Sequence, residues 1–127
     1  MVLEDFAMAY MLLILEQRGD RQARGAEGGR EAYGAMLRYR DSLKERGLHI
    51  ASDALRGDYQ GARVEQRGGK RVVVDGPFAE SKEMIGGYFL VNCATKQQAI
   101  ELAAECPASA WAKVEVREIG TCFEDLA

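Results

Sequence analysis

The sequence predicts an α+β fold in which the order β-α-β-β-α-β builds one antiparallel sheet with both helices on the same face. Two segments show helical periodicity, and strand-like segments precede, separate and follow them. A short hairpin pattern is inserted between the second and third of these main strands. The chain has 127 residues, which is the length of a single domain.

The composition is that of an ordinary globular protein, with 47% hydrophobic and 29% charged residues. Lysine and arginine together number 17 against 20 acidic residues, which gives a net charge of −3. A basic excess would point to nucleic acid or to an anionic membrane surface as a partner. The sequence has no such excess, so neither partner is expected.

Cysteine usage favours a cytoplasmic protein with reduced thiols. Cys93, Cys106 and Cys122 are odd in number and have no C-x-x-C spacing, which argues against a disulfide framework and against a zinc site. The chain has one histidine, so it offers no evident set of metal ligands. We therefore expect neither a metal nor a redox cofactor.

The first strand is predicted from Met8 to Glu16, within the apolar run at residues 6–15. The ten residues of this run are about half of what a membrane span needs, and the acidic residues before it are unlike a signal peptide. The polar stretch 17–29 is rich in glycine and arginine, so we predict a mobile surface loop there. An arginine-rich phosphate-binding loop is the alternative, although Asp20 and Glu27 dilute its charge.

The first helix is predicted to begin at Arg30, where apolar residues recur at spacings of four, three and four. Charged residues occupy the opposite face. Gly47 follows the last periodic residue and fits a left-handed helix cap. The apolar stripe consists of Ala32, Met36, Tyr39 and Leu43.

Three strands are predicted in the middle of the chain. Weak alternation from Leu48 to Leu55 predicts the second main strand. Residues 63–66 and 71–74 flank Gly68-Gly69, and this pair suits a two-residue hairpin turn because glycine adopts positive φ easily. The apolar run from Tyr88 to Cys93 predicts the third main strand.

The second helix is predicted to begin after Thr95, because Thr95 and Gln98 form a capping-box pattern. Pro107 ends this helix. Regular alternation of apolar and charged residues from Ala112 to Ile119 predicts the last strand. Residues from Gly120 onward have the composition of a loose tail.

The all-apolar first strand also predicts a homodimer. Two helices can cover only one face of the sheet, so the other face would expose methionine and leucine side chains to water. A second copy of the chain, packed sheet against sheet, is the simplest cover for that face.

The stretch from Asp75 to Val91 is the predicted functional site, because it combines special-backbone and ionisable residues. Asp75 ends a strand just before a Gly-Pro turn, and its carboxylate can act as a general base or can form hydrogen bonds within the turn. Glu80 beside Lys82 is an acid-base pair in one interpretation and a solvated ion pair in the other. Gly86-Gly87 predicts a β-bulge or a close backbone approach to a ligand or to the partner chain. The candidate ligand-binding residues are Gly76, Pro77, Phe78, Glu80, Lys82 and Tyr88.

Two further residues are candidates for proton transfer with Asp75. His49 has an unperturbed pKa near neutrality, so a proton shuttle would use it, although it can also simply neighbour a helix C-terminus. Tyr33 is the second assisting group. Together with Tyr88 and Trp111, Tyr33 could line an organic ligand pocket or belong to the core or dimer interface.

The run VVVDGPFAESKEMIGGYFLV at Val72 to Val91 resembles the YCII-related family, specifically its branch named for the DGPF motif. The segments YMLLI at 10–14, AIELAAECPA at 99–108 and VEVREI at 114–119 extend the resemblance. It implies a ferredoxin-like, dimeric α/β barrel over residues 10–120, preceded by an N-terminal extension (1–9) and followed by a C-terminal tail (121–127).

The resemblance implies less about activity. The family is similar in fold to small-molecule isomerases and dehalogenases, and shorter relatives carry a suggested catalytic His-Asp pair with the histidine on the first helix. Here that helix has no histidine and offers Tyr33 and Glu31 instead, while His49 begins the second strand. DGPF-branch members also resemble neighbours of extracytoplasmic-function sigma factors, which suggests regulation.

Two functions therefore remain open. The first is a cytoplasmic enzyme or binding protein that holds a small organic molecule in a cleft beside the DGPF turn. The second is a non-catalytic regulatory or interaction module in which DGPF only shapes the turn. A cavity beside Asp75 would favour the first function, and a filled turn would favour the second.

Overall fold

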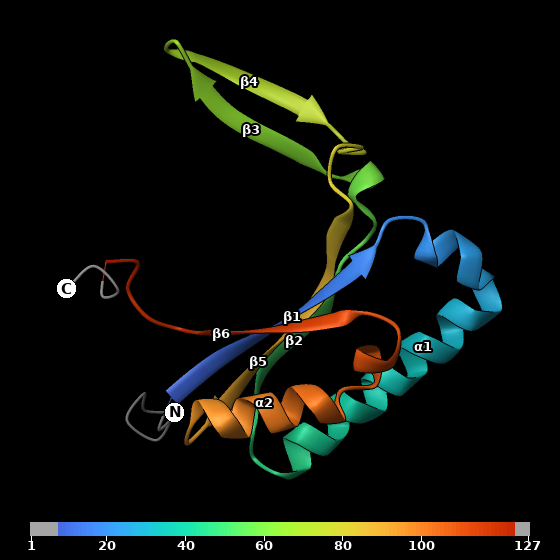
Figure 1. The fold of residues 1–127 in the computed structure, drawn as a ribbon, viewed down its shortest axis with the longest axis vertical. Helices are drawn as coiled ribbons and strands as arrows, with labels where there is room; N and C mark the ends of the chain where they lie inside the picture. The colour runs from blue at the N-terminus through green and yellow to red at the C-terminus, as the bar shows by residue number, and fades with distance from the viewer. Residues whose placement is uncertain (1–7, 124–127) are drawn as a thin grey trace.

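The computed structural model describes residues 8–123 and has the predicted α+β architecture (Figure 1). Its main sheet is antiparallel with strand order β2-β5-β1-β6, the order of a ferredoxin-like fold. The remaining strands, β3 and β4, form a separate hairpin. The elements are β1 (Met8–Gln17), α1 (Asp20–Glu45), β2 (His49–Ala54), η2 (Asp58–Gln60), β3 (Ala62–Arg67), β4 (Lys70–Asp75), β5 (Glu83–Cys93), α2 (Lys96–Glu105), η3 (Pro107–Ala110) and β6 (Lys113–Glu118).

One face of the sheet packs against both helices to form the core. Alternate residues of β1 and β5 point toward this face and are buried, as the period of two requires. Leu43 of α1 and Leu102 of α2 pack onto them and are almost fully buried. The core residues of the two central strands are Tyr10, Leu12, Ile14, Phe89, Val91 and Cys93.

The other face, which we call the open face, carries the intervening residues of the same strands. Met11, Leu13 and Leu15 of β1 lie there and are partly exposed, as is Leu90 of β5. The prediction that two helices leave one apolar face uncovered is therefore confirmed for the single chain.

Three of the four helix ends lie where the sequence predicts them. Gly47 takes φ 70° just after α1, as its position predicted. Thr95 accepts a hydrogen bond from the Gln98 backbone N–H, and the Gln98 side chain bonds back to the Ala94 N–H, which completes the cap of α2. Pro107 follows α2 directly.

The predicted loop at residues 17–29 is wrong, because α1 already begins at Asp20. Only Gly25 leaves helical geometry, with φ 77° and ψ 176°, and it breaks the helix at that point. Gly28 and Gly29 remain helical, since a glycine costs a helix only about 1 kcal/mol relative to alanine. The break separates a short first segment from the long helix that packs on the sheet.

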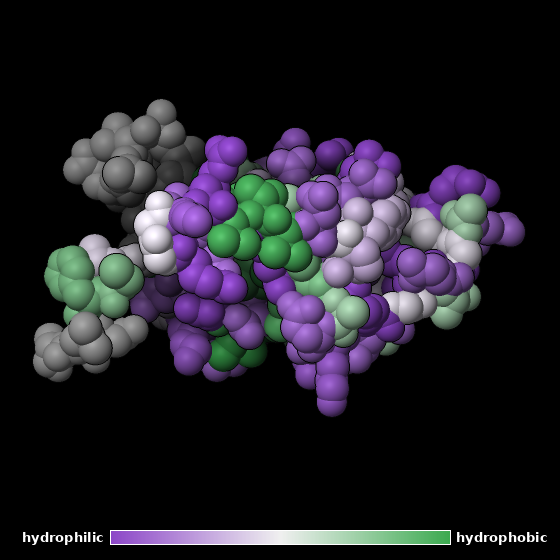
Figure 2. All heavy atoms as spheres, turned by 90° about the horizontal axis from the view of Figure 1, so that it is seen from above, coloured by the Kyte–Doolittle hydropathy of each residue, from purple (hydrophilic) through white to green (hydrophobic). Residues whose placement is uncertain are grey.

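The β3–β4 hairpin projects away from the sheet (Figure 1). Its turn is the predicted glycine pair, with φ 58° at Gly68 and 78° at Gly69. Val64, Val73 and Val74 on its strands are more than half exposed. Figure 2, viewed from above, shows a hydrophobic patch over this hairpin among hydrophilic side chains.

The terminal segments of the prediction lie partly beyond the described structure. Residues 1–7 of the proposed extension and 124–127 of the proposed tail are outside the described residues. Residues 119–123 of the described part form no helix or strand. Cys93 and Cys106 are buried, Cys122 is exposed, and all three are free thiols.

Candidate functional site

A cavity of about 590 Å³ lies between α1 and the sheet. Residues of β1, β2, β5 and η3 complete its wall. Much of the lining is apolar, and includes Ile14, Met36, Leu37, Phe89, Ala108 and Trp111. The polar and charged side chains that border it include Glu16, Arg21, Arg24, Tyr33, Arg40 and Ser52.

A β-bulge at Gly86-Gly87 shapes one end of the cavity. The register between β1 and β5 shifts between Ile14 and Leu15, which leaves Gly86 as the extra residue. A Cβ atom on Gly86 would lie 1.7 Å from Oε2 of Glu16, and one on Gly87 would lie 2.9 Å from a main-chain oxygen of β2. The predicted bulge at this glycine pair is confirmed, and the close contacts that require glycine are made within the chain itself.

Glu16 fills the space that Gly86 leaves open. It is the one buried charged residue in the described chain, and Arg21 binds both of its oxygens. The distances are 2.6 Å from Nε to Oε1 and 2.9 Å from Nη2 to Oε2. The Arg21 Nη2 group also donates to the Gly86 carbonyl oxygen at 3.4 Å. This two-point contact compensates the buried carboxylate with a full opposite charge.

His49 reaches the cavity through Ser52. A bulge in β2 between His49 and Ala51 places His49 opposite Val91 and Ser52 opposite Phe89, so both side chains lie on the helix-covered face. Nε2 of His49 lies 2.8 Å from Oγ of Ser52, which borders the cavity. Partial burial, together with the charges of Lys44 and Arg40, lowers the pKa of His49 below its ordinary value of 6.5. The imidazole is thus neutral at neutral pH.

This shift predicts a pH-dependent stability that can be assigned to one group, because the chain has a single histidine. The unfolded chain takes up the proton near pH 6.5 and the folded chain only at lower pH, so stability should fall as the pH drops through that interval. A proton NMR titration of the imidazole should give a midpoint below 6.5. His49→Gln should flatten the stability slope in the same interval. A midpoint above 6.5 would contradict the burial described here.

Asp53 and Tyr88 border the cavity but direct their side chains elsewhere. They are paired across β2 and β5, and Tyr88 also lies opposite Leu13 of the open face. Because side chains alternate along a strand, both point to the open face. There the Tyr88 hydroxyl donates to Oδ2 of Asp53 at 3.4 Å.

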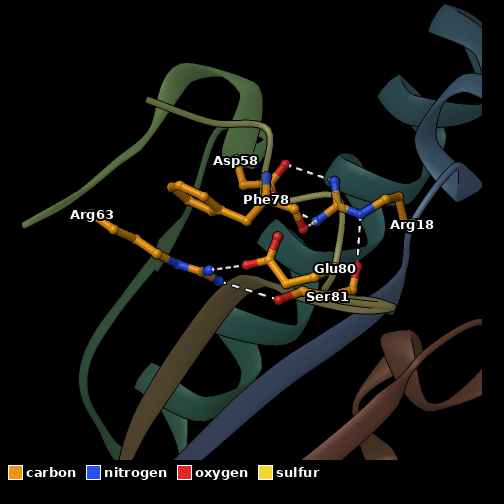
Figure 3. A network of polar contacts seen from close by, with 6 residues as sticks. All are labelled: Arg18, Asp58, Arg63, Phe78, Glu80 and Ser81. Atoms are coloured by element: carbon orange, nitrogen blue, oxygen red, sulfur yellow. Dashed lines mark hydrogen bonds and ion pairs between the residues drawn. The ribbon is translucent and has the colours of Figure 1, made fainter. Parts of the chain in front are cut away.

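The DGPF turn lies apart from the cavity and is held by Arg18 at the end of β1 (Figure 3). The Arg18 guanidinium pairs with both oxygens of Asp58, at 2.9 Å between Nη1 and Oδ1. It also donates to the main-chain oxygens of Phe78 at 3.1 Å and of Ser81 at 2.8 Å. The hydrogen bond from Arg18 holds the pKa of Asp58 below its usual value. One arginine thus links the first strand, η2 and the turn.

A second arginine closes the other side of the turn. Arg63 of β3 lies over the Phe78 ring, 3.8 Å from its centroid, and pairs with the Glu80 carboxylate. It also donates to the Ser81 hydroxyl at 3.2 Å. Phe78 is buried, and Glu80 pairs with Arg63 rather than with Lys82. These side chains pack around the turn, whose residues contribute nothing to the lining of the cavity described above.

Asp75 ends β4 on the exposed hairpin, opposite Ala62. Its carboxylate makes no hydrogen bond or ion pair with any described residue, so the turn-forming contact considered for it is absent there. Gly76 and the exposed Pro77 follow it, joined by a cis peptide bond. The Gly76 N–H donates to the Gly61 carbonyl oxygen at 2.9 Å.

The structure therefore divides the predicted site residues into two groups. Tyr33 and Tyr88 border the cavity, and His49 contacts it through Ser52. The stretch from Asp75 to Lys82 contributes nothing to its lining. That stretch contains the candidates Asp75, Gly76, Pro77, Phe78, Glu80 and Lys82.

Sequence reasoning missed the polar residues nearest the cavity, above all Glu16. A signal for it existed, since Glu16 continues the i, i+2 series of Ile14 and Leu12 and must point toward the core. A buried carboxylate needs a partner, and Arg21 follows within one turn of helix. Arg24 was missed because its segment was assigned to a loop.

Neither a metal site nor a membrane helix appears in the described chain. Within residues 8–123, no three histidine, cysteine, aspartate or glutamate side chains cluster closely enough to hold a metal ion. None of the helices described there is long and apolar enough to cross a membrane.

Comparison with known proteins agrees with this architecture. An uncharacterised protein of Rhizobium meliloti (strain 1021) is 39% identical over 44 residues, which cover 35% of this chain and 36% of that protein. The match thus spans about a third of the relative. The profile of the YCII-related domain matches residues 8–121, nearly the whole chain and all of the strands and helices described above. The chain belongs to the YCII-related domain family.

Proposed function

We propose that this protein binds a small organic molecule in the cavity between α1 and the sheet and transforms it by acid-base chemistry. The observation that carries the proposal is the cavity itself. Its volume of about 590 Å³ lies within the range typical of small-molecule sites, and its largely apolar wall carries a few converging polar groups. The DGPF turn contributes no residue to its lining.

The acid-base groups would be Ser52, His49 and Tyr33. A neutral imidazole can accept the Ser52 hydroxyl proton across their 2.8 Å contact, which leaves the serine oxygen free to accept a proton from a bound molecule. Tyr33 borders the cavity from α1 and is 54% exposed, so its phenol can donate a hydrogen bond from the other wall. In this arrangement, the serine passes the proton on to His49.

The active unit would be a homodimer formed through the open face. Met11, Leu13 and Leu15 make an apolar row there, and the exposed valines of the hairpin add further uncovered surface. A two-stranded hairpin is at best marginally stable alone in water, so contact with a second copy would stabilise it. Localisation in the cytoplasm fits the three free thiols.

The alternative function is a non-catalytic regulatory or interaction module, including a role beside an extracytoplasmic-function sigma factor. The filled DGPF turn favours it, because the arginine contacts leave the motif no room for a ligand. The projecting hairpin with its exposed valines would then be the contact surface for the partner.

A substitution that blocks the cavity distinguishes the ligand-binding function from the regulatory alternative. Purified protein exposed to a metabolite extract and measured by native mass spectrometry should retain a small molecule. Ala32→Phe should abolish retention, because Ala32 borders the cavity and a phenyl ring would fill part of it. Ala104→Phe adds the same ring on the exposed side of α2 and should retain the molecule.

Asp75→Asn tests, in the same assay, the location of the site that the sequence predicts. The exposed carboxylate has no contact to lose, so retention and melting temperature should both stay unchanged. Loss of retention in Asp75→Asn but not in Ala32→Phe would return the site to the DGPF turn. Retention of no small molecule by the wild-type protein would favour the regulatory alternative.

A further inference from the structure

We infer that the ligand of the cavity is a small organic acid, a carboxylate on a flat apolar body, and that Arg24, which lies over the Trp111 ring, binds its acid group. This inference rests on the proposed function and adds to it the chemical class of the ligand. Its basis is the distribution of charge around the cavity.

The charged side chains that α1 contributes to the cavity are all basic. They are Arg21, Arg24 and Arg40, whereas none of the five acidic residues of the same helix borders it; these are Asp20, Glu27, Glu31, Asp41 and Glu45. A helix that carries both signs of charge thus presents one sign to the cavity. An apolar space lined in this way attracts anions.

Each other charge near the cavity already has a partner. Arg21 is bound to Glu16 at two points, and Arg40 pairs with the neighbouring Asp41 at 3.1 Å. The second bordering acid, Asp53, faces the opposite side of the sheet, where the Tyr88 hydroxyl donates to it. This leaves Arg24 as the cavity cation without a carboxylate partner among residues 8–123.

The position of Arg24 suits carboxylate binding on an apolar wall. Its guanidinium carbon lies 5.5 Å from the centroid of the Trp111 ring, a cation–π contact. Within residues 8–123 the Arg24 guanidinium makes no hydrogen bond and no ion pair, so its N–H groups are free to donate to a carboxylate. Trp111, Met36 and Phe89 provide apolar surface for the rest of the molecule. Arg24 is one cation without a carboxylate partner, so the cavity can neutralise one carboxylate of a ligand.

Phenylacetate and phenylacetamide test this inference, because they have nearly the same shape and differ in charge. Binding measured by calorimetry should be at least about tenfold tighter for phenylacetate, the usual gain from a charge-assisted contact. Arg24→Gln should remove this preference and leave phenylacetamide binding unchanged. Arg24→Lys keeps the charge without the planar fork and should retain part of the preference. Circular dichroism melts would verify that both variants are folded.

Arg30→Gln is the matched control, since Arg30 lies on the same helix, is exposed and does not border the cavity. It should keep the full preference for phenylacetate. Equal binding of the two probes by the wild-type protein would overturn the inference and leave the proposed function intact. Equal losses in Arg24→Gln and Arg30→Gln would also overturn it. Failure of both probes to bind at millimolar concentration would overturn this inference, whereas the proposed function is decided separately by metabolite retention in the wild-type protein and in Ala32→Phe.

Discussion

Leu13→Glu should convert a dimer of this protein into monomers or drive it to aggregate. Leu13 lies on the open face, opposite Tyr88 of β5 and Glu115 of β6, near the middle of the sheet. In a sheet-to-sheet dimer each copy would bury the new carboxylate, and the desolvation penalty of several kcal/mol per charge should raise the dissociation constant by about a thousandfold or more. Light scattering measures this directly, because the wild-type particle should have about twice the chain mass of 14.0 kDa.

Ile100→Glu is the control for this substitution. Ile100 is an exposed apolar residue on α2, and α2 packs on the opposite face of the sheet. The same change there should leave the dimer intact. A monomeric wild-type protein would refute the dimer outright, and an unaffected Leu13→Glu dimer would place the interface elsewhere.

The parts of the fold that could be predicted are those set by short-range patterns. The stripe ending at Leu43 describes one face of α1, and the capping residues Thr95 and Gln98 fix the start of α2 through contacts within four residues. Gly68-Gly69 likewise determines its own turn. Each of these signals acts within one element, so the sequence shows it without knowledge of the tertiary structure.

The start of α1 could not be predicted in the same way. Five glycines and arginines within residues 17–25 and the glycine pair at 28–29 resemble a loop locally. The segment is nevertheless helical on either side of Gly25, and Arg21 is fixed by the buried Glu16. A tertiary contact here outweighs weak local propensity.

The candidate site depended still more on the tertiary fold. Arg18 and Asp58 are 40 residues apart, and only the fold brings them together. The Phe78 main chain of the DGPF motif contacts Arg18 and Asp58, and the sequence alone does not show these contacts. By contrast, the cavity residues come from five separate elements and form no motif in the sequence.

Gly76→Ala should destabilise the protein strongly. A Cβ atom at this position would lie 1.8 Å from the main-chain oxygen of Asp58 and 2.8 Å from its carbonyl carbon. These are backbone atoms of η2, so relief requires moving a segment that Arg18 holds on one side and the Gly76–Gly61 hydrogen bond holds on the other. We expect a loss at the upper end of the overpacking range, about 3 kcal/mol, which for this size corresponds to a melting temperature lower by about 10 °C.

Gly29→Ala is the control for this substitution. It makes the same chemical change but should raise the stability of the protein. Gly29 is helical and has no atom within 4 Å of the added Cβ, so the substitution should stabilise the protein by about 0.5–1 kcal/mol. Thermal and denaturant unfolding of the two variants would measure the difference. If Gly76→Ala melted within a degree or two of the wild type, the η2 backbone would have to yield easily. The DGPF turn would then not be rigidly packed, and it would become available again as a ligand site.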